Sequence, residues 1–305
     1  MISRYTYHGL TWVDLESPTR EEIVHVAEEF SLPQLVSEEL FQNTLHSKVD
    51  LYDNLIYLIL HFPLITAKSG ENNEQEVDFV IGKKFIVTTR YETIDPMHTF
   101  AKLFEVHSLL DREKMTSHAG FIFMEMMKEF YKSTLHELED ITNTIRHIER
   151  QIFTKNEKSI VKEISHASHK LLTFKQALRF HRNILLSYET ASSRFFGSDY
   201  MYYASVITSE FNKVDTVLET HREILNELQR TNDSLLTSRT NDIVKRLTII
   251  TFVMMPFTVI GGLFYMNTTD NVIFIKTINE FYAVVGSMVA LSILIFIYFK
   301  RKKWL

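Results

Sequence analysis

The residues of this 305-residue chain best suited to chemistry lie in an apolar run near its C-terminal end. Residues 247–266 (LTIITFVMMPFTVIGGLFYM) carry no charge but include Thr248, Thr251 and Thr258. Hydroxyl groups on an apolar helix can line a narrow polar route, or they can simply pack against neighbouring helices. Helical spacing alone leaves both interpretations open.

The histidines suggest a second possible chemistry, zinc binding. His166 and His169 stand three residues apart in a predicted helix, with His136 and His147 on the preceding segment. No carboxylate or second histidine pair completes a site at recognisable spacing. The chain also has no phosphate-binding glycine loop and no nucleophile motif, so we expect neither an enzyme nor a bound cofactor.

Two apolar runs dominate the end of the chain. Residues 247–266 and residues 281–299 are each uncharged, and each is long enough to cross a bilayer as a helix, which takes roughly 20 residues. The connector between them, residues 267–280, is short. These lengths predict a transmembrane hairpin of two helices.

The charges that flank the hairpin predict its orientation. Lys245 and Arg246 precede the first span, and the basic tail, residues 300–305 (KRKKWL), follows the second. Basic flanks stay on the cytoplasmic side, so both termini should be cytoplasmic in a cell membrane, inner or plasma. The opening residues are too polar for a signal peptide.

Overall composition excludes other classes of partner. The net charge of −5, from 33 basic and 38 acidic residues, argues against nucleic acid and would suit cations. Cysteine is absent, which excludes disulfides and thiolate metal sites.

The N-terminal part, residues 1–95, is typical of a mixed α/β domain. Alternation and capping signals predict a strand at 10–15, helices at 18–30 and 33–41, and three more strands at 54–62, 76–81 and 85–89. Ser17 and Pro18 offer an N-cap and a first-turn proline to the first helix, and Thr19 and Glu22 stand at capping-box spacing. Residues 82–84 (Gly-Lys-Lys) suggest a hairpin turn.

Residues 96–246 are predicted to form a helical region. Proline is absent between Pro96 and Pro256, and a break at Phe196-Gly197-Ser198 separates two helical arms. The second arm starts near Tyr200 and continues into the first span without a break, which predicts a helix on the order of 100 Å long. Such a helix needs neighbours in a bundle or oligomer.

Several segments carry a resemblance to a known family, and together they cover the chain. They are WVDL at 12–15, LPQLVSEEL at 32–40, KVDLYDNLIYLILHF at 48–62, VIGKKFIVTT at 80–89, NDIVKRLTIITFVMMPFTVIGGLFYMN at 241–267 and YFKRKKWL at 298–305. The chain resembles the CorA family of magnesium and divalent cation transporters. The resemblance implies an α+β cytoplasmic domain, long stalk helices and a transmembrane hairpin in a funnel-shaped homopentamer. It also implies passive, potential-driven uptake of Mg²⁺, and of Co²⁺ or Ni²⁺.

The family signature Gly-Met-Asn closes the first span, and here it is Tyr265-Met266-Asn267. By this match, a ring of Asn267 amides forms the outer selectivity site and contacts the water shell of Mg²⁺. Tyr265 departs from the signature. We expect its ring to point away from the axis. The change is either neutral packing, or a cause of altered ion choice or of weakened transport.

The resemblance also implies further site residues. The pore-lining positions would be Asn241, Val244, Leu247, Thr251, Met255 and Thr258. Mg²⁺ would be the substrate and a possible regulatory ligand, with Asp199, Glu210 and Asp215 in the region of the regulatory sites. A solvated helix face explains these three acids equally well.

Two alternatives remain open. A zinc transporter of the related ZntB type shares the architecture. A membrane-anchored metal sensor that does not conduct would be a different class of protein, and Tyr265 is the departure from the family signature on which this alternative rests.

Overall fold

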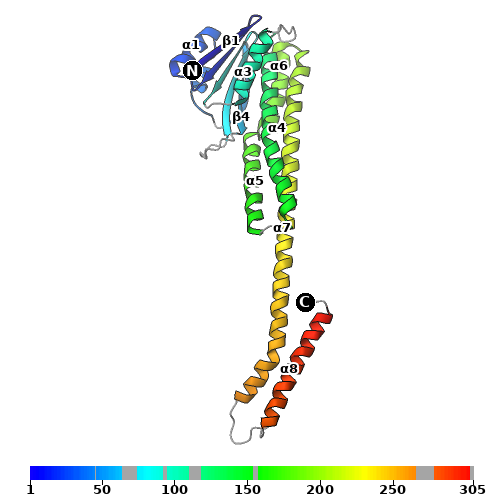
Figure 1. The fold of residues 1–305 in the computed structure, drawn as a ribbon. Coiled ribbons are helices and arrows are strands. Elements are labelled where there is room, and N and C mark those ends of the chain that lie inside the picture. The colour runs from blue at the N-terminus through cyan, green and yellow to red at the C-terminus, as the bar shows by residue number, and fades with distance from the viewer. Residues whose placement is uncertain are drawn as a thin grey trace. The chain divides into compact units, whose positions relative to one another are not determined.

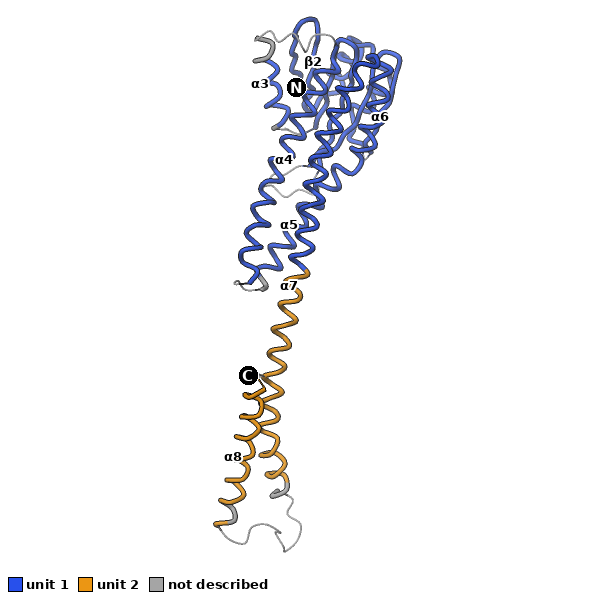
Figure 2. Tube along the Cα trace, turned by 90° about the vertical axis from the view of Figure 1, so that its right-hand side faces the viewer, with its two compact units in different colours: residues 1–229 blue, residues 230–305 orange. Residues whose placement is uncertain are grey.

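The computed structural model describes residues 1–44, 46–63, 74–91, 95–109, 118–153, 157–265 and 278–302. The chain divides into two compact units, residues 1–229 and residues 230–305 (Figure 2). The boundary between the units falls inside the helical region predicted for 96–246.

The first unit contains a six-stranded sheet of order β1-β2-β6-β5-β4-β3 (Figure 1). Only the β2–β6 pair is parallel among these neighbours. The strands are β1 (Ile2–Tyr7), β2 (Leu10–Glu16), β3 (Lys48–Leu51), β4 (Leu55–Pro63), β5 (Glu74–Gly82) and β6 (Phe85–Arg90). The predicted strands and the β5–β6 hairpin are confirmed. At Gly82 any added Cβ would collide with the Phe85 ring, which explains the glycine.

Helices cover both faces of this sheet, and its central strands bury mostly apolar residues on both sides. On one face, α1 (Arg20–Phe30) and α2 (Gln34–Glu39) pack on side chains that alternate along each strand. Val13 of β2, Tyr57 of β4 and Val87 of β6 are among them. On the other face, Trp12 lies 5.2 Å from Phe100 of α3 (Asp95–Leu109), and Phe79 lies 5.1 Å from Phe123 of α4 (Gly120–Gln151), between ring centroids.

The predicted capping box of α1 is confirmed. The Thr19 side chain accepts the Glu22 N–H, and the Glu22 carboxylate accepts the Thr19 N–H at 2.8 Å. Thr19, rather than Ser17, is therefore the N-cap. Ser17 instead has a φ of 43° and donates its hydroxyl to the Tyr91 carbonyl at 2.6 Å.

The first helical arm contains breaks that the sequence analysis did not predict. It comprises α4, α5 (Glu157–Ala177) and α6 (His181–Phe196). No glycine or proline marks the change from α5 to α6. The ring of His181 is buried there and bonds to Tyr131 and to the His61 carbonyl, so tertiary contacts hold the turn in place.

The two long C-terminal helices match the prediction. Gly197, with a φ of 108°, ends α6, and α7 (Tyr200–Tyr265) runs for 66 residues. The last helix is α8 (Ile278–Arg301). By length and composition, the described residues include two helices able to cross a membrane, the C-terminal part of α7 and α8.

Candidate ion-conducting helix pair

In the second unit, α8 packs along the C-terminal part of α7 (Figure 1). Ile249 and Ser292 are buried at this contact, and the Ser292 hydroxyl donates to the Val253 carbonyl at 3.2 Å. The rings of Phe252 and Phe299 lie 5.9 Å apart. The face of α7 toward α8 is therefore fixed by contacts.

The predicted pore-lining positions lie on the opposite face of α7. The face of α7 that α8 covers carries residues that are buried or half-buried and that follow one another at intervals of four, three and four residues. They are Ile249, Val253, Pro256 and Ile260. At 3.6 residues per turn, the predicted pore positions from 244 to 258 point the other way. All are exposed in the single chain, Leu247 by 58% and Met255 by 55%. Asn241 is exposed as well.

The threonine hydroxyls of this segment have a common geometry. Thr251 donates to the Leu247 carbonyl at 3.0 Å, and Thr258 donates to the Met254 carbonyl at 3.2 Å. Each hydroxyl has one hydrogen and two lone pairs, so its hydrogen is used within the helix. Each oxygen can then act toward the exposed side only as an acceptor.

The signature lies at the end of the described part of α7. Met266 and Asn267 fall outside the described residues, and Tyr265 is the last residue of the helix. Because seven residues are close to two turns, position 265 follows Thr251 and Thr258 on the same face. The expected orientation of the Tyr265 ring away from the axis lies outside the described side chains, and it stays a prediction.

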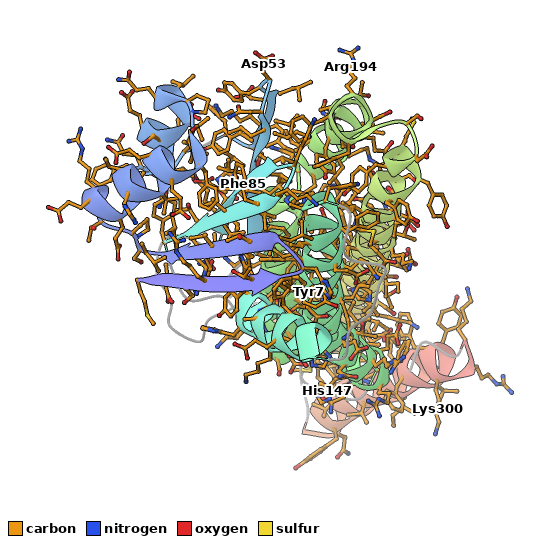
Figure 3. The ribbon with its side chains drawn as sticks, turned by 90° about the horizontal axis from the view of Figure 1, so that it is seen from above. Tyr7, Asp53, Phe85, His147, Arg194 and Lys300 are labelled. Atoms are coloured by element: carbon orange, nitrogen blue, oxygen red, sulfur yellow. The ribbon has the colours of Figure 1, made fainter. Side chains whose placement is uncertain are left out.

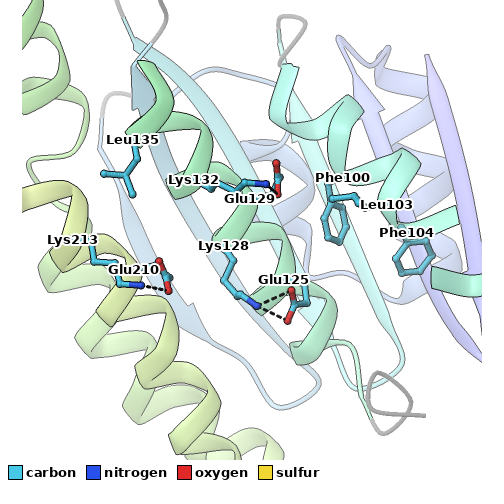
Figure 4. Close-up of a pocket in the computed structure, with 10 residues that line it drawn as sticks. All are labelled: Phe100, Leu103, Phe104, Glu125, Lys128, Glu129, Lys132, Leu135, Glu210 and Lys213. Carbon is cyan, nitrogen blue, oxygen red and sulfur yellow. Dashed lines mark hydrogen bonds and ion pairs between the residues drawn. The ribbon is translucent and has the colours of Figure 1, made fainter. Parts of the chain in front are cut away.

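The three candidate regulatory acids lie apart from one another in the first unit. Asp199 accepts a hydrogen bond from Ser198 at 3.4 Å, Glu210 pairs with Lys213 at 2.7 Å, and Asp215 pairs with Arg182 at 2.6 Å. Glu210 lines a cavity of about 390 Å³ beside two more Glu–Lys pairs, from Glu125 and Glu129 (Figure 4). Among the described residues, no three His, Asp or Glu side chains converge to hold a metal. A regulatory role for the three acids stays a prediction.

His181 is a structural residue that the sequence analysis missed. Its Nε2–H donates to the His61 carbonyl at 2.7 Å, and its Nδ1 lies 2.8 Å from the Tyr131 hydroxyl, which donates to it. Burial lowers the pKa of His181 to about 4, so the ring is neutral. The sequence did contain one signal that His181 is buried: it follows the apolar residues Phe174 and Leu178 at helical spacing.

Comparisons with known proteins agree over nearly the whole chain. A model of the family described as CorA-like Mg²⁺ transporter protein matches residues 7–301. The cobalt/magnesium transport protein CorA of Thermotoga maritima is 23% identical, over 97% of this chain and 83% of that protein. The magnesium transport protein CorA of Campylobacter jejuni is 24% identical, over 97% of this chain and 92% of that protein.

The fold agrees with that of a solved transporter. The complete structure of the CorA magnesium transporter from Methanocaldococcus jannaschii has a TM-score of 0.82 at 18% identity and covers 100% of this chain and 94% of that chain. This likeness confirms the predicted α+β domain with long helices. With the family match over residues 7–301, it leads to one conclusion: the chain belongs to the CorA-like Mg²⁺ transporter family.

Proposed function

We propose that this chain is a CorA-type membrane channel or transporter for the passive uptake of divalent cations, with Mg²⁺ as the leading substrate. The observation that carries the proposal is the exposed face of α7, opposite α8, with its threonine oxygens and apolar side chains. Since two helices cannot enclose an aqueous path, several copies must surround it. The resemblance to the family favours a homopentamer with α7 inside and α8 outside.

The side chains of this face suit a hydrated cation. Mg²⁺ releases its water reluctantly, and the hydrogens of its water shell point outward. Acceptor oxygens at Thr251 and Thr258 can bind that shell without replacing it, and the amide oxygens of Asn241 and Asn267 add further rings of acceptors. Rings of Leu247 and Met255 would act as apolar constrictions that close by dewetting.

Orientation and driving force follow from the flanking charges. Lys245, Arg246 and the basic tail would hold both ends in the cytoplasm, so the first unit faces the cell interior. Moving one elementary charge across a membrane potential of 100 mV releases about 2.3 kcal/mol of free energy, hence about 4.6 kcal/mol for a divalent ion. The membrane potential alone can therefore drive uptake. Mg²⁺ would also be the regulatory ligand, with Asp199, Glu210 and Asp215 at contacts between copies.

The experiment that tests this function is uptake of Mg²⁺, Co²⁺, Ni²⁺ and Zn²⁺ into liposomes that contain the purified protein. The native chain should take up Mg²⁺, and Asn267→Ala should abolish or derange selective uptake. Unchanged Mg²⁺ uptake by Asn267→Ala would remove that residue from the mechanism.

The same assay separates the alternatives. The ZntB cytoplasmic domain of Vibrio parahaemolyticus shares this fold with a TM-score of 0.61 at 12% identity, over 78% of this chain and 90% of that chain. Proton-coupled uptake of Zn²⁺ would favour a ZntB-type transporter. A metal-dependent change in the first unit without uptake of any ion would favour a sensor.

A further inference from the structure

A buried carboxyl group in the sheet has no role in the proposed conduction path. Asp78, in the middle of β5, is 0% exposed. It stands between Ile59 of β4 and Thr89 of β6. Neither of its carboxylate oxygens has a hydrogen-bond donor among the described residues. An ionised carboxylate in such a place costs several kcal/mol unless it is paired, so a proton is the simplest ligand for Asp78.

The neighbour that would share this proton is Glu76. Glu76 is two residues from Asp78 on the same face of the strand and is also buried. Its carboxylate accepts the Thr44 N–H at 2.6 Å and the Thr44 hydroxyl at 3.3 Å, and it lies 3.6 Å from His61 Nε2. Because Glu76 has these donors and Asp78 has none among the described residues, the proton belongs on Asp78, which can then donate to Glu76.

The other groups around Asp78 do not neutralise it. Lys48 of β3 is the nearby cation, and it already pairs with Glu39 at 2.6 Å and with Asp50 at 2.8 Å. Burial raises the pKa of Asp78 well above its usual range, and the charge of Glu76 raises it further. The titratable groups that face the pair from the surrounding elements are Glu39 of α2, Lys48 of β3, Tyr57 and His61 of β4, and Tyr91 after β6.

We propose that Asp78 and Glu76 form a proton-binding site that holds one proton between two buried carboxyls and thereby keeps α2, Thr44 and Ser47 docked on the sheet. The link to that segment is direct. Glu76 holds Thr44, while His61 bonds to the Thr44 carbonyl at 3.0 Å and to the Ser47 hydroxyl at 2.9 Å. Loss of the proton would leave two adjacent buried charges beneath this segment and would favour its release. This inference is independent of the proposed transport function.

The sign of the pH dependence follows from the raised pKa. A group with a raised pKa in the folded state contributes stability that is fully present below its unfolded pKa and is lost as pH rises through the folded pKa. The pKa of His61 is also raised: burial acts to lower it, but its contact with Glu76 and its bond to Thr44 outweigh burial. Both groups therefore make the docked state weaker at alkaline pH.

Infrared difference spectroscopy of the full chain in detergent tests the site directly. The native protein should show the carbonyl band of a protonated carboxylic acid at neutral pH, and the band should disappear in Asp78→Asn. The matched control is Asp53→Asn, which removes an exposed carboxylate near the β3–β4 turn and should keep the band (Figure 3). Glu76→Gln should move the loss of the band to lower pH. Absence of the band in the native protein, or its persistence in Asp78→Asn, would overturn the proposal.

Hydrogen exchange gives a second readout. After correction for the intrinsic effect of pH, exchange in residues 34–47 should rise at alkaline pH in the native chain. The rise should be smaller in Asp78→Asn, where only the contribution of His61 remains. An equal rise in both proteins would contradict the link to α2. The infrared titration of the native chain tests the proton site even if Asp78→Asn folds poorly.

Discussion

Replacing Thr251 by valine tests whether its hydroxyl faces a conducted ion. Valine has nearly the same shape as threonine but lacks the oxygen. The hydroxyl donates to the Leu247 carbonyl within the helix and leaves only its lone pairs for the exposed face. Thr251→Val should therefore remove an acceptor from the path while changing little of its shape.

The size of the effect follows from one lost contact. A hydrogen bond to a charged group contributes about 1.5–3 kcal/mol, and water polarised by a divalent cation resembles that case. If the ion loses one such contact at the step that limits the rate, the lower value corresponds to about tenfold slower Mg²⁺ uptake. In an oligomer every copy loses its hydroxyl, so tenfold is the smallest effect we expect.

Thr248→Val is the matched control. Thr248 makes the same kind of intrahelical bond, to the Val244 carbonyl at 2.8 Å, but it is half-buried at the flank of the face and adjoins buried Ile249. Its replacement should alter the rate of uptake by no more than about twofold, which corresponds to a free-energy change of about 0.5 kcal/mol. The assay is the initial rate of Mg²⁺ uptake into liposomes at matched protein content. Equal rates for the two variants would refute the assignment of Thr251 to the path.

Two further predictions concern the outer signature and the first unit. Tyr265→Gly restores the family signature, and if Tyr265 sets ion choice, the variant should gain Mg²⁺ uptake relative to Co²⁺, Ni²⁺ and Zn²⁺ in the liposome assay; an unchanged ion order would make Tyr265 a packing residue. Tyr131→Phe removes the donor to buried His181 and should lower the stability of the first unit by about 1–3 kcal/mol in denaturant unfolding, whereas Tyr202→Phe, at a side chain exposed by 72%, should change it by less than about 0.5 kcal/mol. Equal stabilities of these two variants would contradict the role of the Tyr131–His181 bond.

The sequence predicted the elements that carry strong local signals. The capping box at Thr19 and Glu22, the hairpin at Gly82 and the unbroken helix from Tyr200 each follow from residue types at fixed spacing. Family membership also confirms that the chain is a transport protein and not an enzyme. Apolar runs of bilayer length, with basic flanks, were enough to predict the helix pair.

Elements set by tertiary contacts were missed. β1 is an edge strand whose residues are mostly half-buried or exposed, and β3 has only four residues, so neither shows a clear alternation. The turn from α5 to α6 lacks glycine and proline, and its position depends on the bonds of His181 to distant residues. The Asp78–Glu76 pair was also hidden, because a charged residue in a strand pattern suggests exposure until the covering helix is known.

The central claim is that the face of α7 opposite α8 lines the ion path, and cysteine scanning tests it most directly. The chain has no native cysteine, so each substitution introduces a single reactive group. A charged thiol reagent should block Mg²⁺ uptake when cysteine replaces Thr251, Met255 or Thr258. It should leave uptake unchanged when cysteine replaces Ile249, Val253 or Ile260. Block at the second set, or block without helical periodicity, would contradict the account.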